Sequence, residues 1–290
     1  MSELGRDIGP PRADHVRKPV GWYLAWVGSC AFGFFGVWYA FQLGLGYDSH
    51  AYWLAVQDMG RLYGAPALAR DAFLYSPAFA QLIWPLGLLP WPAFYVLWTL
   101  LSAVIFVWLL RPLGRTWFAP AFIATLPEIV TGNIYALMAA ALVLGVSSGP
   151  PWVFLGLTKI AGGGVGLVWL TLTRQWRALV VGLVTAMAVV GLSVAISLDQ
   201  WRNWIQFLLH GSTPTANSIS SPVLTAVLLG AGLAAVVVGA LTRRAWMLSV
   251  AAILVSPTIG LNTLTLLAAA PRLAQWSAPD DGHAIEADEP

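Results

Sequence analysis

The sequence is short of charged residues. Asp, Glu, Lys and Arg make up 10% of the 290 residues, whereas hydrophobic residues make up 58%, and the mean hydropathy is +0.73. A soluble domain carries about 25% charged residues, so most of this surface must tolerate lipid instead of water. The shortage excludes an ordinary soluble globule and indicates an integral membrane protein.

Several chemical motifs are also missing. The single cysteine, Cys30, lies in an apolar run and excludes an internal disulfide or a cysteine-based metal cluster. There is no phosphate-binding glycine loop ending in Lys-Ser/Thr, no His-Glu-x-x-His and no Gly-x-Ser-x-Gly. Basic residues are too dispersed for nucleic-acid binding. Acidic residues are too few for a convincing carboxylate site, so we expect neither metal nor cofactor.

Long apolar runs punctuated by basic residues are what the sequence has instead. The run Trp22–Leu45 is long enough to cross about 30 Å of hydrocarbon. Residues 1–20 before it are polar and basic, which places the N-terminus in the cytoplasm. No polar linker divides residues 21–270, so we expect one all-α polytopic domain. The acidic tail, 271–290, is expected to be disordered and cytoplasmic.

The apolar stretch 75–110 is broken at Pro90-Trp91-Pro92. Two full crossings would put Arg111 and Arg115 outside, whereas a re-entrant segment plus one crossing would put them inside. The positive-inside rule favours the second arrangement.

Further basic residues mark the later turns. We expect outward passes over 116–130 and 178–198, returns over 133–147 and 222–241, and an out-and-back segment over 245–270, broken at Ser256-Pro257. The block 151–173 is interrupted by Lys159 and by Gly162-Gly163-Gly164, which predicts two half-length helices meeting near the outer face.

The total is about ten transmembrane or half-membrane helices. Broken helices are tolerated at membrane depth only where they pack on protein or line a wet cavity, so a cavity is predicted. Outer loops are expected over 47–71, with a short interfacial helix at 50–63, and over 199–221.

Scattered polar residues fall near the predicted outer face: Asp48, Ser76, Glu128, Lys159, Asn217 and Asn262. Asp48 could be a general base, a metal ligand or a solvated loop residue, and His50 could tune it or do nothing. Lys159 interrupts an apolar block, where an ionisable group is costly and functional by default. It could bind a phosphate, pair with Glu128 or Asp48, or reach out to the interface. Glu128 could equally cap a helix.

The second outer loop offers Arg202 between Trp201 and Trp204, followed by His210. Indoles beside an arginine fit sugar stacking, but they fit an aromatic belt at the membrane interface better.

An ordered series of short motifs resembles one enzyme family. The series runs through Asp48-Ser-His-Ala-Tyr52-Trp53, Gly60-Arg-Leu-Tyr63, Phe73-Leu-Tyr75-Ser76-Pro77-Ala-Phe79, Leu86-Gly-Leu-Leu-Pro90, Leu97-Trp98, Gly132-Asn133-Ile134, Lys159, Arg174-Gln-Trp176-Arg177-Ala178 and Ser256-Pro257. It resembles glycosyltransferase family 87, the polyprenol-phosphate-mannose-dependent α-mannosyltransferases of the GT-C fold. The order and spacing carry the resemblance over about residues 45 to 270.

The resemblance implies a GT-C-like bundle in which Asp48 is the catalytic base. A polyprenyl-phosphate sugar, with mannose as the sugar in this family, would be the donor, with its phosphate near Lys159. The expected substrate-binding residues besides Lys159 are His50, Tyr52, Tyr75, Ser76, Glu128, Asn133, Arg202, His210 and Asn262. A lipid-phosphate donor needs no nucleotide-binding domain, which agrees with the missing phosphate loop.

The chain also departs from the family pattern. Asn133 and Tyr135 stand where a glutamine and a polar residue are usual, and Asn262 stands where a histidine is often found. Asparagine cannot carry a proton, so His210 or His50 substitutes, or that role is absent.

The leading hypothesis is a glycosyltransferase that moves a sugar, with inversion, to a lipid or glycan acceptor on the outer face of a bacterial-type inner membrane. Both termini would be cytoplasmic. The alternatives are a non-catalytic GT-C-like subunit bound to a membrane-protein partner, and a lipid or sugar transporter.

Overall fold

The computed structural model describes residues 18–66, 69–211, 221–256 and 260–277, and within these ranges it contains helices and turns but no strand. The longer helices are α1 (Val20–Leu43), α4 (Trp91–Leu110), α10 (Trp176–Ile196) and α12 (Pro222–Leu241). The shorter α-helices are α2 (Tyr47–Gln57), α3 (Pro77–Gly87), α5 (Gly114–Ile123), α6 (Leu126–Thr131), α7 (Tyr135–Gly145), α8 (Pro150–Thr158), α9 (Ile160–Leu172), α11 (Leu198–Gln206), α13 (Met247–Leu254) and α14 (Ala270–Ser277). Four 3₁₀ or π segments join them: η1 (Met59–Arg61), η2 (Arg111–Leu113), η3 (Phe207–Gly211) and η4 (Leu261–Ala269).

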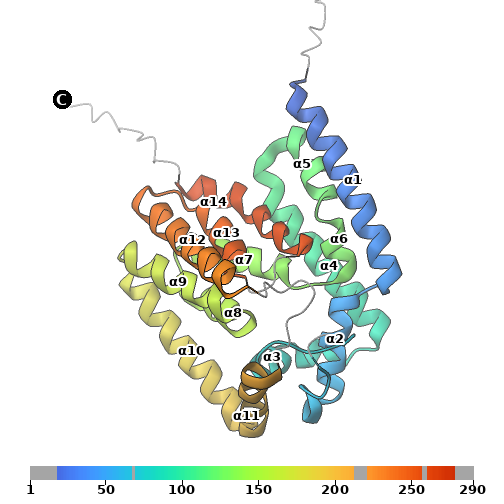
Figure 1. Ribbon diagram of the computed structural model, residues 1–290, viewed down its shortest axis with the longest axis vertical. Coiled ribbons are helices and arrows are strands. Elements are labelled where there is room, and N and C mark those ends of the chain that lie inside the picture. Colours follow the sequence, from blue (N-terminus) through green and yellow to red (C-terminus); the bar gives the residue numbers. More distant parts are fainter. Residues whose placement is uncertain (1–17, 67–68, 212–220, 257–259, 278–290) are drawn as a thin grey trace, which may run out of the picture.

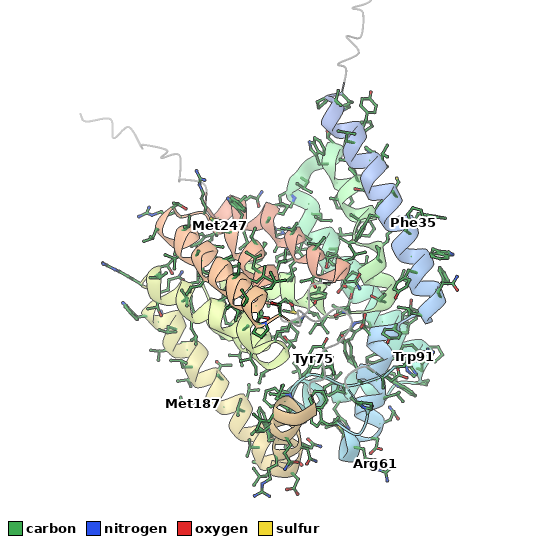
Figure 2. The ribbon with its side chains drawn as sticks, in the orientation of Figure 1. Phe35, Arg61, Tyr75, Trp91, Met187 and Met247 are labelled. Atoms are coloured by element: carbon green, nitrogen blue, oxygen red, sulfur yellow. The ribbon has the colours of Figure 1, made fainter. Side chains whose placement is uncertain are left out.

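Four described segments are long and apolar enough to cross a membrane: Val20–Gln57, Trp91–Ile123, Trp176–Ile196 and Pro222–Leu241. The first includes both α1 and α2, and the second includes α4 and α5. Helix α1 is apolar on all sides and exposes large side chains such as Phe34, Phe35 and Trp38 along its length (Figure 2). A helix of this kind is stable only with lipid around it, so the membrane assignment holds.

Small residues let α1 approach the rest of the bundle. A side chain at Gly33 would meet Ile123 of α5, and one at Gly36 would meet Pro127 of α6 at 2.4 Å. Close approach through small residues is typical of helix packing in membranes, where no water is released to drive association.

Helix α7 is the centre of the molecule. It contacts α4, α8, α13 and η4, and most of its residues are buried, among them Met138 and Leu142. With 11 residues it is only about 16 Å long, which is too short to span a bilayer alone. Protein therefore surrounds it, as expected of a half-membrane helix.

Several predicted breaks occur where the sequence placed them. Helix α3 ends at Gly87 and α4 begins at Trp91, so Pro90-Trp91-Pro92 does interrupt the stretch 75–110. The block 151–173 is split into two short helices, α8 and α9. Proline begins both α3 and α8, where its missing N–H costs no hydrogen bond.

Three expectations need correction. Gly162-Gly163-Gly164 does not break the helix: the break is at Lys159 alone, whose backbone is extended, and the three glycines lie inside α9. The outer loop expected over 199–221 is helical through α11 and η3 as far as Gly211, and 212–220 lies outside the described residues. The expected tail from 271 begins later, because α14 continues to Ser277.

Different helices lie at the two ends of the bundle (Figure 1). The start of α1, the helix α5 and α14 lie toward one end, whereas α2, α3 and α11 lie toward the other. Helix α10 runs between them, from the end of α9 to α11.

Candidate functional site

Asp48 lies in the first turn of α2, at the point where this helix meets the start of the central helix. Gly46 precedes it in the left-handed conformation (φ 70°) and donates its N–H to the carbonyl of Val130 at 3.0 Å. The predicted helix over 50–63 thus starts earlier, at Tyr47, and carries Asp48 with it. A carboxylate in the first turn is favoured by the helix dipole.

The break between α6 and α7 forms the wall opposite Asp48. Gly132 is left-handed (φ 69°), and a Cβ there would lie 2.3 Å from Ser49 Oγ, so only glycine allows α2 to pack this closely. The break places the side chains of Thr131 and Asn133 beside the carboxylate of Asp48.

The orientation of the Asn133 amide follows from its other partners. Its Oδ1 accepts from the Ile134 N–H at 2.7 Å and from the Tyr52 hydroxyl at 3.4 Å. The NH₂ group is therefore the one that faces Asp48. Asn133 therefore lies between the Asp48 carboxylate and the Tyr52 hydroxyl.

A buried aromatic group extends the site along α2. Tyr52, one helical turn after Asp48, lies with its hydroxyl 3.2 Å from that of Tyr75. Tyr63 donates to the Tyr75 carbonyl at 2.7 Å, and burial raises the pKa of the Tyr63 hydroxyl, which keeps it a donor. Ser76 follows, is fully buried, and donates its N–H to the Leu157 carbonyl at 3.2 Å. Figure 2 shows Tyr75 near the centre of the molecule.

Lys159 occupies the break between α8 and α9, with the extended backbone that separates the two helices. Its ammonium donates to the hydroxyls of Tyr135 and of Ser256, the latter at 3.0 Å, and lies 4.4 Å from the centre of the Tyr135 ring. No ion pair involves Lys159 in the described part of the chain. Neutral oxygens solvate this cation, and its charge acts on the carboxylate of Asp48.

Glu128 acts as a helix cap. Its Oε1 accepts the Tyr135 N–H at 2.8 Å, so the carboxylate caps the start of α7. Of the two alternatives that the sequence left open, this geometry favours the cap over a pair with Lys159. The residue is fully buried, and its Oε2 has no hydrogen-bond partner among the described residues.

Asn262 also reaches the site. Its Nδ2 donates to Thr131 Oγ1 at 3.1 Å, and Thr131 lies beside Asp48. The next residue, Thr263, lies 2.9 Å from the Tyr135 hydroxyl that holds Lys159. The start of η4 therefore contacts residues around Asp48 and residues around Lys159.

Two predicted residues are not brought to this cluster. His50 pairs with Asp71 at 2.8 Å and packs against the rings of Trp53 and Trp91. Arg202 is exposed and pairs with Asp199 at 3.0 Å. The side chain of His210, like Asn217, lies outside the described residues.

Sequence reasoning gave no site role to four contributors: Thr131, Tyr135, Ser256 and Thr263. Ser256 belongs to a motif that it identified, and the other three are neighbours of one, since Thr131 and Tyr135 flank Gly132-Asn133-Ile134 and Thr263 follows Asn262. Hydroxyl side chains beside a predicted break are the feature that could have found them. Among the described residues, no three His, Cys, Asp or Glu side chains gather as a metal site would require.

Fold and site together define a polytopic membrane protein with a polar site where short helices meet inside the bundle. The sequence model of glycosyltransferase family 87 matches residues 73–279, so the chain belongs to this family and is a membrane glycosyltransferase. The match begins after Asp48, which therefore lies outside it. No curated protein and no solved structure matches the chain.

Proposed function

We propose that this glycosyltransferase moves mannose from a polyprenyl-phosphate donor to a hydroxyl of a lipid or glycan acceptor, with inversion at the anomeric carbon. One observation carries the proposal. A carboxylate, Asp48, and a cation, Lys159, belong to the same polar site, and among the described residues they form no ion pair with each other, since neutral hydroxyls hold the lysine. Both charges thus remain available to a substrate.

The chemistry needs a base and a partner for a leaving phosphate. In the proposed reaction, the Asp48 carboxylate accepts the proton of the acceptor hydroxyl while that oxygen attacks the anomeric carbon. The bond from this carbon to the phosphate oxygen breaks, and the polyprenyl phosphate leaves with the electron pair. The ammonium of Lys159 stabilises the negative charge that develops on the phosphate. One direct displacement inverts the anomeric configuration.

Surrounding residues are suited to these roles. Thr131 and Asn133 lie beside the carboxylate of Asp48, where they are placed to orient it for proton transfer. Tyr135 and Ser256 hold Lys159 in the same way. The lack of a phosphate-binding loop in the sequence supports a lipid-phosphate donor over a nucleotide sugar. The choice of mannose rests on the resemblance to the family.

The proposed orientation puts Asp48 outside and both termini in the cytoplasm. The turns that carry Arg111 and Arg115, Arg174 and Arg177, and Arg243 and Arg244 each follow an apolar helix, and α2 with Asp48 lies at the opposite end from the start of α1 (Figure 1). The positive-inside rule then places the basic turns in the cytoplasm, in a bacterial-type inner membrane.

A donor comparison tests the function. The purified protein in proteoliposomes is given labelled mannose as polyprenyl-phosphate mannose or as a nucleotide sugar, together with a membrane lipid extract as the acceptor source. We expect labelled product from the lipid donor alone, with the opposite anomeric configuration by NMR. Product from the nucleotide sugar alone would refute the proposal, and a matching lipid donor carrying glucose tests the choice of sugar.

A further inference from the structure

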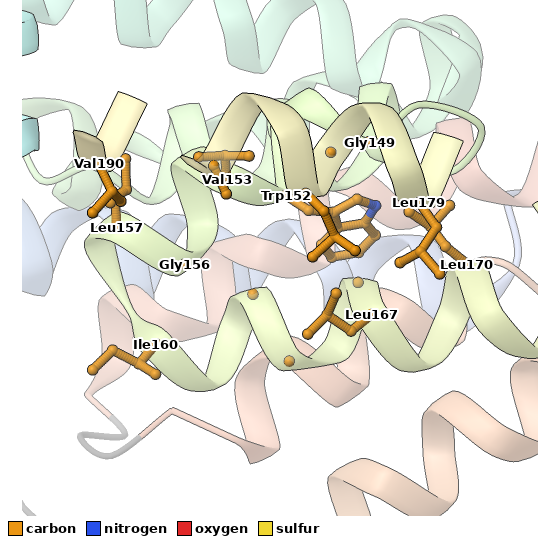
Figure 3. A pocket seen from close by; sticks show the side chains of 16 residues that line it. Gly149, Trp152, Val153, Gly156, Leu157, Ile160, Leu167, Leu170, Leu179 and Val190 are labelled. Atoms are coloured by element: carbon orange, nitrogen blue, oxygen red, sulfur yellow. The ribbon is translucent and has the colours of Figure 1, made fainter. Parts of the chain in front are cut away.

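An apolar groove runs between α8, α9 and α10, on the outside of the hairpin that carries Lys159 (Figure 3). Its volume is about 250 Å³. Figure 3 shows Trp152 at its floor, Ile160 and Leu167 along α9, and Val190 at one end.

The lining accepts apolar ligands only. Besides Trp152, all the lining side chains are aliphatic or absent, and six of the lining residues are glycine. The one polar side-chain atom, Trp152 Nε1, already donates to the Gly145 carbonyl at 2.7 Å. A ligand with hydrogen-bonding groups would lose its water in this groove without replacing it, whereas a hydrocarbon chain would not.

The glycines fall into two kinds. Some allow close packing: a Cβ at Gly149 would meet the Ala178 carbonyl at 2.0 Å, and one at Gly163 would meet Gly156 at 2.8 Å. Gly164 differs, because a Cβ there meets nothing within 4 Å and faces open space. Packing therefore does not require glycine at position 164, although a side chain there would project into the groove.

One end of the groove lies beside the break at Lys159. Leu157 and Ile160 line this end, and they flank the break at Lys159. Leu157 is also the residue whose carbonyl accepts the Ser76 N–H. The other end is lined by Gly149 and Leu179, about one length of α8 away.

We propose that this groove binds the isoprenoid chain of the donor, with the phosphate end at the Lys159 break. This assignment rests on the proposed function, since it needs a donor that joins an anion to a long hydrocarbon chain. The groove supplies the apolar part and the lysine supplies the charge, and only such a ligand uses both. Donors with a long chain should then bind more tightly than short-chain analogues.

Two matched variants test the groove. Gly164→Leu fills it, and Gly191→Leu places the same side chain on α10, where a Cβ also meets nothing within 4 Å but no groove is lined. We expect Gly164→Leu to raise KM for the long-chain donor severalfold, because the leucine side chain occupies the groove and removes packing contacts of the isoprenoid chain. KM for a donor with a two-isoprene chain should stay within about twofold, as should both values for Gly191→Leu. An equal change for both donors, or none, would overturn the proposal.

A binding experiment separates this inference from the proposed function. Polyprenyl phosphate with a photoactivatable group in its chain is cross-linked to the full-length protein in vesicles, and the labelled residues are mapped. Labelling of α8–α10 that excess polyprenyl phosphate removes, but excess phosphatidylglycerol does not, supports the groove even if no sugar transfer is found. Labelling that phosphatidylglycerol removes equally would identify an ordinary membrane-lipid site. Labelling confined to other helices, with sugar transfer intact, would refute the groove and leave the function standing.

Discussion

The site is assembled from two helix breaks that are built differently. Between α6 and α7 the chain turns through a left-handed glycine, Gly132, and the neighbouring polar side chains lie beside Asp48. Between α8 and α9 a single extended residue, Lys159, separates the helices and supplies the charge itself. Tyr135 connects the two, because its N–H bonds to the cap Glu128 and its hydroxyl accepts from Lys159.

This difference indicates separate roles for the two breaks. The first break is crowded, and the side chains of Glu128, Thr131 and Asn133 each bond to nearby backbone, which suits the orientation of a base. The second presents a partly buried cation that neutral oxygens hold, which suits capture of an anion. The comparison predicts that substitutions at the first break lower kcat and the stability of the fold. Substitutions at the second break should weaken the interaction with the phosphate of the donor.

The largest effect should come from Asp48→Ala. Loss of a general base lowers kcat by about 10³-fold, so transfer from labelled lipid-phosphate sugar should be nearly abolished. The matched control is Asp199→Ala, which removes an exposed carboxylate from α11 and should leave transfer unchanged. Circular dichroism and gel filtration check that both variants fold. Full activity in Asp48→Ala would remove this residue as the base.

Lys159→Met should reduce kcat by about 10²-fold, because a positioned cation at a developing negative charge contributes about that factor. Methionine keeps most of the apolar length, so α8 and α9 should still pack. Lys159→Arg keeps the charge and should recover part of the loss. If methionine and arginine variants were equally inactive, the position would depend on shape and hydrogen bonding instead of charge.

Gly132→Ala tests the crowding of the first break. The new Cβ would lie 2.3 Å from Ser49 Oγ at a left-handed backbone, so we expect a loss of about 2–4 kcal/mol of stability, seen as a lower Tm in detergent. Gly28→Ala on α1, where a Cβ meets nothing within 4 Å, is the control and should leave Tm unchanged or slightly raised. An unchanged Tm for Gly132→Ala would mean that α2 does not pack on the break as described.

The sequence predicted one part of this site much better than the other. The break at Lys159 could be found, because a charge within an apolar block is expensive and so stands out. The contacts of Asp48 could not, since they depend on how α2 packs against α6 and α7, which no local pattern encodes. The three consecutive glycines were wrongly predicted to break the helix, for a related reason. In water their high backbone entropy ends helices, but in the bundle Gly163 allows α8 and α9 to approach, and the packing outweighs the propensity.

The smallest effect is expected at His50, two residues from Asp48. Residues at this spacing point to different sides of a helix, and His50 bonds to Asp71 among the rings of Trp53 and Trp91. Its partly exposed pair is worth less than about 1 kcal/mol, so His50→Gln should keep kcat and KM within about twofold. The sequence left open that His50 replaces the histidine that the family often has at position 262. That role would give a large loss and a changed pH–rate profile, and would extend the catalytic site to the second face of α2.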